Sequence, residues 1–478
     1  MTALAPFLAR VAELPERSAL IAADGETLNY AALDGWAAVL AEAYARAGVG
    51  PGTRVLVALG ISPALYAVLI ALWRIGAVAV FPEPAAGLSG LRHALATAGP
   101  TAYVGPRRWG MLAAFLARRV VLAMPLAMAR ASRAGNAAPG TWPDDHPALI
   151  SFTSGSTGKP KGILRTHGFL LAQQRALAPL LTPDEQTRDL VCLPLFVLAG
   201  LGLGVTAVLP DASLREPALV DGARLAAQID RHHVTRLLAP PSIADRLAEQ
   251  PAFARLRRIF TGGGPVWPDV MRRLLAAAPD ASIFAVYGST EAEPIAHQLL
   301  NHLDATDWAA MEAGGGLPAG MPVPDIALRI IEDEIQVAGP HVNRGYLDPS
   351  QDVANKIGEG ETIWHRTGDA GRIGPDGRLW LLGRLEGRAG RWFPFAMEVA
   401  ARGWPGVKQA ALIENDERVC LVIAGSSGQE LSWRDRLVSF PGIELVVVPS
   451  IPLDRRHQAK VDYARLRSLL SARKASGQ

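Results

Sequence analysis

Two long uncharged runs stand out in the pattern of hydrophobic and polar positions along the first half of the chain. The first covers residues 55–73, between two arginines, and the second covers residues 190–210. A membrane-spanning helix needs about 20 mostly apolar residues without a break. The first run does break, at a Gly-Ile-Ser-Pro sequence in which Ser62 can cap a helix that starts at Pro63.

The pattern around this break predicts a buried strand–helix–strand unit instead of a membrane span. The strands expected at 55–59 and 77–81 are apolar on both faces, which is typical of a parallel sheet covered by helices. The second run contains Pro194 and three spaced glycines, which also favour a segment of a protein core. We therefore expect no membrane span.

The rest of the first three hundred residues alternates short apolar runs with amphipathic helices, which predicts a doubly wound α/β fold. One such helix is expected at 31–47, and a glycine- and proline-rich stop follows it. Further strands are expected at 205–210, 233–238, 256–260 and 281–287.

Shorter strand-like segments follow, and they predict a β-rich subdomain. They lie at 327–331, 334–337 and 378–382, and the Gly-Pro-Asp-Gly sequence before the last one predicts a hairpin turn. The residues beyond Gly383 form a smaller α/β segment, in which strands are expected at 410–413 and 419–423.

Composition narrows the class of protein without changing this fold. The 478 residues include 48 Lys+Arg and 45 Asp+Glu, so a net charge of +3 gives no reason to expect a nucleic-acid partner. Hydrophobic residues make up 49% and charged residues 19%, which excludes a disordered chain or a coiled coil. Cys192 and Cys420 have no CxxC or histidine-rich surroundings, so we expect reduced core residues in a cytoplasmic protein.

The strongest local motif is TSGSTGKPKG at residues 153–162, directly after an apolar strand. Its glycines let the backbone approach an anion closely, its hydroxyl and amide groups donate to phosphate oxygens, and its lysines add charge. It differs from a Walker A loop, because Thr153 and Pro160 stand where that motif needs glycine and serine or threonine. Pro160 also prevents the loop from continuing directly into a helix. A flexible Ser/Gly linker is the alternative, but a linker would not place these residues in this order after a buried strand.

This motif resembles the phosphate-loop signature of the AMP-forming adenylating enzymes, which include acyl- and aryl-CoA ligases, nonribosomal adenylation domains and luciferases. Other landmarks of that superfamily recur in the expected order along almost the whole chain. The resemblance implies that the nucleotide is bound by residues of these motifs, namely Thr153, Ser154, Gly155, Ser156, Thr157, Gly158, Lys159, Gly262, Gly263, Gly264, Tyr287, Gly288, Ser289, Asp369 and Arg384.

Individual roles are implied by the motif that each residue matches. YGSTE at 287–291 resembles a YGxTE motif, which implies that Thr290 contacts the α-phosphate and that Glu291 helps to hold Mg²⁺. RTGD at 366–369 resembles the motif whose aspartate, here Asp369, binds both ribose hydroxyls. Alone, either acid would be an ordinary turn or surface residue, and only the order of the motifs makes it a ligand candidate. A GPxxxxGY-like segment follows Asp333, which stands where glycine is usual.

The segment PLDRRHQAKVD at 452–462 resembles the loop that carries the catalytic lysine of the superfamily, which implies that role for Lys460. When a carboxylate attacks the α-phosphate of ATP, two anions meet, so the site needs donors, a metal and a mobile cation. The resemblance implies a large adenylation domain at 1–383 and a small mobile lid at 384–478. Glu386 falls at the hinge, where aspartate or lysine is more common.

Two features bear on the step after adenylation, in which an acceptor takes the acyl group and releases AMP. The Arg456-His457 pair, LPLF at 193–196 and YGSTEAEP at 287–294 resemble the β-lactone synthetases of bacterial long-chain olefin biosynthesis, in which an adenylated β-hydroxy acid closes on its own hydroxyl. The segment 388–398 departs in spacing from the strand that shapes the thiol tunnel of CoA ligases. This departure argues against thiol transfer more than against adenylation; the alternative is a diverged loop that still admits a pantetheine arm.

The sequence thus predicts ATP-dependent, AMP-forming activation of a carboxylic acid, with a fatty or β-hydroxy acid favoured, followed by thiol transfer or closure to a β-lactone. ATP and Mg²⁺ are the expected cofactors, and CoA or a carrier-protein phosphopantetheine is an open alternative. The expected partner is the small-molecule acid, with an acyl carrier protein or pathway enzymes left open. We expect Phe196, Pro240 and Gly262 to line the acyl pocket.

Two other functions stay open at this point. An oxyanion such as nitrite could replace the carboxylate in the same chemistry. A catalytically silent relative would bind only a nucleotide or a partner protein, but the intact motif residues argue against this alternative.

Overall fold

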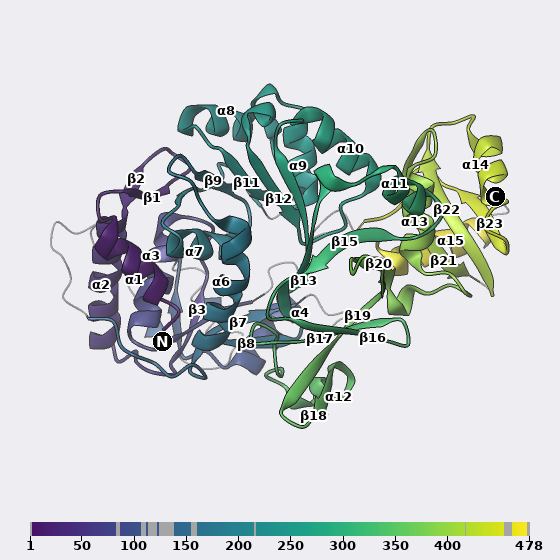
Figure 1. The fold of residues 1–478 in the computed structure, drawn as a ribbon. Coiled ribbons are helices and arrows are strands. Elements are labelled where there is room, and N and C mark those ends of the chain that lie inside the picture. The colour runs from purple at the N-terminus through teal and green to yellow at the C-terminus, as the bar shows by residue number, and fades with distance from the viewer. Residues whose placement is uncertain are drawn as a thin grey trace.

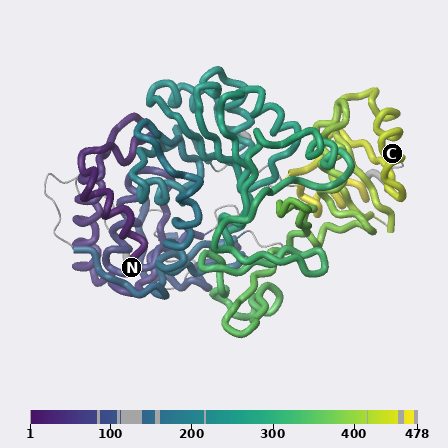
Figure 2. The backbone as a smooth tube through the Cα atoms, viewed as in Figure 1, coloured from purple at the N-terminus to yellow at the C-terminus, as the bar shows by residue number. Residues whose placement is uncertain are grey.

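The structure is a computed structural model, and it describes residues 2–82, 87–106, 111–112, 122–123, 138–153, 160–214, 217–415, 417–453 and 461–475. The chain begins in a large block of helices and strands and ends in a smaller group at the opposite side of the molecule (Figure 1). The backbone trace in Figure 2 shows that antiparallel strands from residues in the second half of the chain lie between these two parts.

The first membrane-length run folds as the predicted strand–helix–strand unit. Its parts are β3 (Arg54–Val57), α3 (Pro63–Arg74) and β4 (Val78–Phe81), and the two strands pair in parallel. Ser62 caps the helix, because its side chain accepts a hydrogen bond from the N–H of Leu65.

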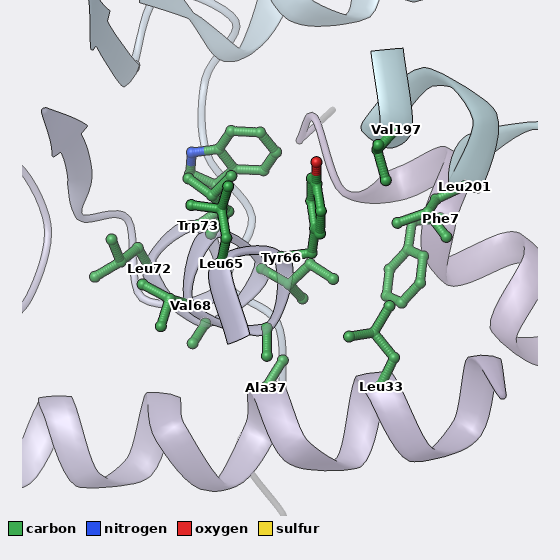
Figure 3. Packing of buried hydrophobic residues seen from close by; sticks show 14 of the residues in the cluster. Phe7, Leu33, Ala37, Leu65, Tyr66, Val68, Leu72, Trp73, Val197 and Leu201 are labelled. Carbon is green, nitrogen blue, oxygen red and sulfur yellow. The ribbon is translucent and has the colours of Figure 1, made fainter. Parts of the chain in front are cut away.

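Helix α3 is buried from several sides, which explains why its sequence is apolar all round. Figure 3 shows it lying across α2 (Tyr30–Arg46), whose Ala37 points toward it, whereas Leu33 of α2 lies below Phe7. On the other side, the Tyr66 hydroxyl donates to the carbonyl oxygen of Pro194 in α7 (Pro194–Gly202) at 3.2 Å. Among the described residues, no helix is long and apolar enough to cross a membrane.

The strand–helix–strand unit belongs to a sheet with the order β6-β5-β3-β4-β7-β8. The other strands of this sheet are β5 (Ala102–Val104), β6 (Leu122–Ala123), β7 (Pro147–Phe152) and β8 (Gly162–Thr166). Strand β7 is parallel to β4, whereas β8 folds back antiparallel to β7. After Pro160 the chain therefore enters a strand and not a helix, as the sequence predicts.

The larger sheet has the order β16-β17-β19-β20-β15-β14-β13-β12-β11-β9-β10-β1-β2, and β18 pairs with β19. Neighbouring strands from β1 through β10, β9, β11 and β12 to β13 are parallel, which confirms the doubly wound α/β pattern. The strands of this part are β1 (Ser18–Ile21), β2 (Thr27–Asn29), β9 (Arg188–Val191), β10 (Thr206–Val208), β11 (Arg236–Ala239), β12 (Arg258–Gly262) and β13 (Ser282–Ser289).

The predicted β-rich segment continues this sheet in antiparallel pairs. Its strands are β14 (Ala292–Leu299), β15 (Leu317–Pro322), β16 (Ala327–Ile331), β17 (Glu334–Ala338), β18 (Lys356–Glu359), β19 (Thr362–Ile373) and β20 (Leu379–Arg384). The predicted hairpin turn joins β19 to β20, and Gly377 adopts the positive φ of 80° that such a turn needs.

Helices accompany these sheets along the chain. Those not yet mentioned are α1 (Ala5–Glu13), α4 (Gly87–Ala98), α6 (His167–Leu181), α8 (Gly222–His232), α9 (Pro241–Ala248), α10 (Pro268–Ala277), α11 (Ala305–Glu312) and α12 (Asp352–Asn355).

The C-terminal segment has its own sheet and core. Strands β21 (Val407–Asn415), β22 (Arg418–Gly425) and β23 (Ile443–Val447) pack with α13 (Pro394–Arg402), α14 (Glu430–Leu437) and α15 (Tyr463–Ala475). The two strands expected here are present as the β21–β22 hairpin. Helix α13 meets α10 through Arg402, which binds the Asp269 carboxylate with its Nε at 2.9 Å and lies over the Trp267 ring.

A buried acid in α13 connects this helix to β21 and α15 by hydrogen bonds. One oxygen of Glu398 in α13 accepts hydrogen bonds from the Tyr463 hydroxyl at 2.6 Å and from the N–H of Leu412 at 3.0 Å. Burial raises the pKa of Glu398 to about 7, although both hydrogen bonds act in the opposite direction. The carboxyl therefore keeps its proton in the folded chain at a pH where an unfolded chain has lost it.

We expect the Glu398→Gln variant to lose much of the pH dependence of stability that this group causes. Because the folded pKa lies above the usual value of 4.5, the stabilisation is complete below pH 4.5 and disappears as the pH rises through about 7. The full effect is about 3 kcal/mol. Denaturant unfolding at pH 5 and pH 8.5 would measure it, with Glu249→Gln on the surface as the matched control. Equal pH dependence in the wild type and in Glu398→Gln would contradict the assignment.

Candidate active site

Several of the predicted nucleotide and acyl residues lie at the carboxyl ends of the parallel strands of the larger sheet. In open α/β sheets, ligands bind at the carboxyl ends of the strands. Gly262 ends β12, Pro240 follows β11, and residues 287–289 end β13. Phe196 lies in the first turn of α7 after β9 and packs in a core cluster that includes Phe260.

The glycine motif at the end of β12 allows a close backbone approach. A Cβ atom on Gly262 would lie 2.5 Å from the carbonyl oxygen of Val286 in β13, and Gly263 has a φ of 81°. Two hydroxyl oxygens near these strand ends, those of Thr261 and Ser289, are buried and have no hydrogen-bond partner in the described part of the chain. Buried polar groups normally have partners, so this edge offers donors and acceptors to a ligand.

Asp369 lies within β19 and is held by two donors. The Tyr287 hydroxyl donates to its Oδ2 at 2.8 Å, and Arg384 donates from Nη1 to its Oδ1 at 2.9 Å. Arg384 is the cross-strand partner of Asp369, since β19 and β20 pair at this position. Burial and the Asp369 charge raise the pKa of Tyr287 well above its usual value, so the phenol stays a donor.

Glu291 lies in the turn between β13 and β14, and the segment that resembles GPxxxxGY holds it from the side. The Tyr346 hydroxyl donates to Oε1 of Glu291 at 2.9 Å, and the N–H of Asn343 donates to the Glu291 carbonyl oxygen at 2.7 Å. Tyr346 belongs to a motif that the sequence identifies, but no role followed from the motif alone. The structure shows that it orients this carboxylate.

The surroundings of Glu291 favour its ionised form. Burial opposes ionisation, but the charge of protonated His365, the hydrogen bond from the Tyr346 hydroxyl and the Lys356 ammonium outweigh it, so the pKa of Glu291 lies below its usual value. At pH 7 the Tyr346 hydroxyl and the Lys356 ammonium remain to favour the ionised carboxylate. Burial and the Lys356 charge lower the pKa of His365 itself to about 4, so this imidazole is neutral at pH 7. Burial also lowers the pKa of Lys356 to about 8, and Glu291 and Asp352 limit that shift.

Arg165 in β8 contacts the same turn, and no sequence motif indicated a role for it. Its Nη2 donates to the carbonyl oxygen of Thr290 at 2.7 Å, and the residue is only 1% exposed. Its guanidinium also lies over the Phe169 ring. Arg165 thereby fixes the backbone of Thr290, whose neighbour is Glu291.

Part of the predicted site lies outside the described residues, namely Ser154, Gly155, Ser156, Thr157, Gly158, Lys159 and Lys460. The two sides of the phosphate-loop segment are described, and the N–H of Thr153 donates to the carbonyl oxygen of Lys161 at 3.1 Å. Glu386 lies exposed between β20 and α13, and its charge acts on Lys161.

These side chains fit a nucleotide and a magnesium ion. A carboxylate has about four acceptor sites, and Tyr287 and Arg384 use one on each oxygen of Asp369, which leaves room for two ribose hydroxyls. Mg²⁺ is usually bound by one or two carboxylates together with substrate phosphates. Tyr346 occupies only one oxygen of Glu291, so the ionised carboxylate has an oxygen available for a metal.

Comparisons with known proteins identify the family of this chain. A family model described as AMP-binding enzyme matches residues 7–347. The olefin beta-lactone synthetase of Xanthomonas campestris pv. campestris is 31% identical over 93% of this chain and 91% of that protein. The feruloyl-CoA synthase of an Amycolatopsis species is 30% identical over 84% of each chain.

A solved structure has the same fold. ATP-bound MatB from Rhodopseudomonas palustris matches with a TM-score of 0.82 at 22% identity, over 98% of this chain and 99% of that chain. This likeness confirms the predicted fold class, and the family match confirms the predicted resemblance to AMP-forming ligases. The chain belongs to the AMP-binding enzyme family.

Proposed function

We propose that this ligase uses ATP to activate a carboxylic acid as an acyl-adenylate, with release of pyrophosphate. The observation that carries the proposal is the placement of Asp369, held by Tyr287 and Arg384, at the sheet edge that also carries the Thr290–Glu291 turn. A ribose-binding carboxylate and a metal-binding carboxylate are the two acids that adenylate formation from ATP needs. The relatives and the family support the same chemistry.

Four residues divide the binding and activation of ATP among them in this proposal. Asp369 accepts hydrogen bonds from the ribose hydroxyls, and Thr290 contacts the α-phosphate. Glu291 is the protein ligand of Mg²⁺, which would neutralise charge on the phosphates as a Lewis acid. Lys460 supplies the mobile cation for the transition state, carried by a small lid at 384–478 that moves about a hinge at Glu386 relative to the large domain at 1–383.

The acid is proposed to enter beside the same strand ends. Phe196, Pro240 and Gly262 follow or end the adjacent strands β9, β11 and β12, so one acyl chain can contact all three. Their apolar character favours an uncharged tail, and a fatty or β-hydroxy acid fits that description.

Two acceptors for the adenylate follow from the two relatives. A β-hydroxy acid can close on its own hydroxyl to a β-lactone, whereas a thiol of CoA or of a carrier protein would give a thioester. We favour ring closure, because the segment 388–398 differs in spacing from the thiol-tunnel strand of CoA ligases. Its Glu398 is buried and bonded to Tyr463 and Leu412. A cytoplasmic location, close to such small acids, remains part of the proposal.

The first experiment is ATP–pyrophosphate exchange with a panel of carboxylic acids and with nitrite. Exchange that requires a fatty or β-hydroxy acid is the expected result. Mass spectrometry of the product, with and without CoA, then separates a lactone from a thioester. Exchange with nitrite only would favour the oxyanion alternative, and tight ATP binding without any exchange would favour a catalytically silent relative.

We expect Lys460→Ala to lower the rate of adenylation by at least about two orders of magnitude, because the transition state loses a cation that the ground state does not need. ATP affinity should stay within about two-fold. Lys408→Ala, an exposed lysine on β21, is the matched control. A Lys460→Ala enzyme with near-wild-type exchange would refute the assignment.

Asp369→Ala should act mainly on nucleotide affinity. It removes two charge-assisted hydrogen bonds to the ribose, so the Kd for AMP is expected to rise by roughly 10- to 100-fold. Isothermal titration with AMP measures this change without any acid substrate. Asp280→Ala, at an exposed position before β13, controls for the loss of one charge. An unchanged Kd for AMP would count against ribose binding by Asp369.

A further inference from the structure

Two lysines from distant parts of the sequence contact one tyrosine ring. The Nζ atom of Lys161 lies 5.3 Å from the centroid of the Tyr346 ring, and Nζ of Lys356 lies 5.2 Å from it. Lys161 ends the phosphate-loop segment, whereas Lys356 begins β18. The sequence motifs assign no role to Lys356.

Both ammonium groups have hydrogen-bonding capacity left over. Lys161 donates to Oδ1 of Asn355 at 2.8 Å, and Lys356 donates to the carbonyl oxygen of Asn343. An ammonium group has three N–H donors, so each lysine has two donors that these bonds do not use. Among the described carboxylates, Glu291 acts on both lysines, yet none forms an ion pair with either.

The electrostatic neighbours place this pair of lysines inside the active site. Lys161 is influenced by Glu291, Arg384 and Glu386, while Lys356 is influenced by Glu291 and by Lys161 itself. The charge of the proposed metal-binding carboxylate thus acts on both lysines, and the arginine that holds Asp369 acts on Lys161. Both lysines are half-buried, so their mutual repulsion is screened less than it would be at the surface.

We propose that Lys161 and Lys356 form the binding site for the pyrophosphate that leaves ATP. This inference rests on the proposed function and assigns Lys356 as a new site residue. A multiply charged diphosphate matches two adjacent point charges with free donors, which is how lysine recognises phosphate. Tyr346 orients the pair, since both ammonium groups contact its ring while its hydroxyl holds Glu291.

Displacement of pyrophosphate by the carboxylate needs no reactant other than ATP and the acid. A carboxylate oxygen forms a bond to the α-phosphorus, and the bond from that phosphorus to the bridging oxygen of the β-phosphate breaks. The electron pair leaves with the bridging oxygen as pyrophosphate. Both lysines stay protonated and offset the charge that accumulates on this leaving group.

A purely structural role for Lys356 makes a different prediction. Lys356 bonds the carbonyl oxygen of Asn343, and the N–H of Asn343 bonds Glu291, so the lysine could simply brace this turn. Loss of a brace would weaken AMP and pyrophosphate binding together. Loss of a pyrophosphate site would leave AMP, which has no β-phosphate, bound as before.

The test is isothermal titration of the full chain with inorganic pyrophosphate and, separately, with AMP, in the absence of any acid. We expect Lys356→Met and Lys161→Met each to raise the Kd for pyrophosphate by roughly ten-fold or more. For Lys356→Met the Kd for AMP should stay within about three-fold of the wild type. Lys356→Arg keeps the charge and should retain most of the pyrophosphate affinity. Lys408→Met is the control for loss of an exposed lysine, and circular dichroism checks that each variant is folded.

Three results would overturn the proposal. An unchanged Kd for pyrophosphate in Lys356→Met excludes the site, and an equal loss of AMP and pyrophosphate affinity assigns a structural role. A loss of CoA affinity in place of pyrophosphate affinity shows that the lysines bind the diphosphate of CoA. Because no acid is present, failure of every acid in the exchange assay would refute the proposed function while leaving this binding result intact.

Discussion

Backbone hydrogen bonds between distant segments hold the active site together. The N–H of Leu347 donates to the carbonyl oxygen of Gly162 at 2.9 Å, and the N–H of Asn343 donates to that of Glu291 at 2.7 Å. Isolated bridges between Ile163 and Tyr346 and between Ala292 and Val342 extend the same contact. One short segment, 342–347, therefore joins the strand after the phosphate loop to the turn that carries Glu291. Together with the bond from Arg165 in β8 to the carbonyl oxygen of Thr290, this junction fixes the smaller sheet against the edge of the larger one.

Side chains then hold each acid of the site in a defined state. Asp369 is paired with Tyr287 and Arg384, whereas Glu291 is held by Tyr346 from the segment 342–347. Each contact occupies some of the carboxylate acceptor sites and leaves others open, so the acids are oriented before a ligand arrives. Preorganised groups of this kind do not have to rearrange when charge develops in a transition state.

Much of this arrangement could be predicted from the sequence, because it depends on local patterns. The break at Ser62 and Pro63 distinguished a buried strand–helix–strand unit from a membrane span, and the motif order singled out Asp369 and Glu291 as candidate ligands. Local patterns were less accurate at β11, which begins at Arg236 and not at 233, because α8 continues to His232 and His233 adopts a left-handed conformation at its end. Arg165 and Lys356 could not be predicted, because their roles come only from contacts with residues far away in the chain.

The strand after the phosphate loop has a consequence for how this protein attracts anions. In a P-loop, a helix begins at this point, and its aligned peptide dipoles contribute part of the positive potential. Here β8 follows Pro160, and strands carry little net dipole. Side-chain charges such as those of Lys161 and Lys356 therefore contribute more of the positive potential than they would beside a helix N-terminus. Dissolved salt screens such charges, so the affinity for a polyanion should fall as the salt concentration rises. Single substitutions add or remove one charge at a time, so evolution can change this affinity without altering the backbone.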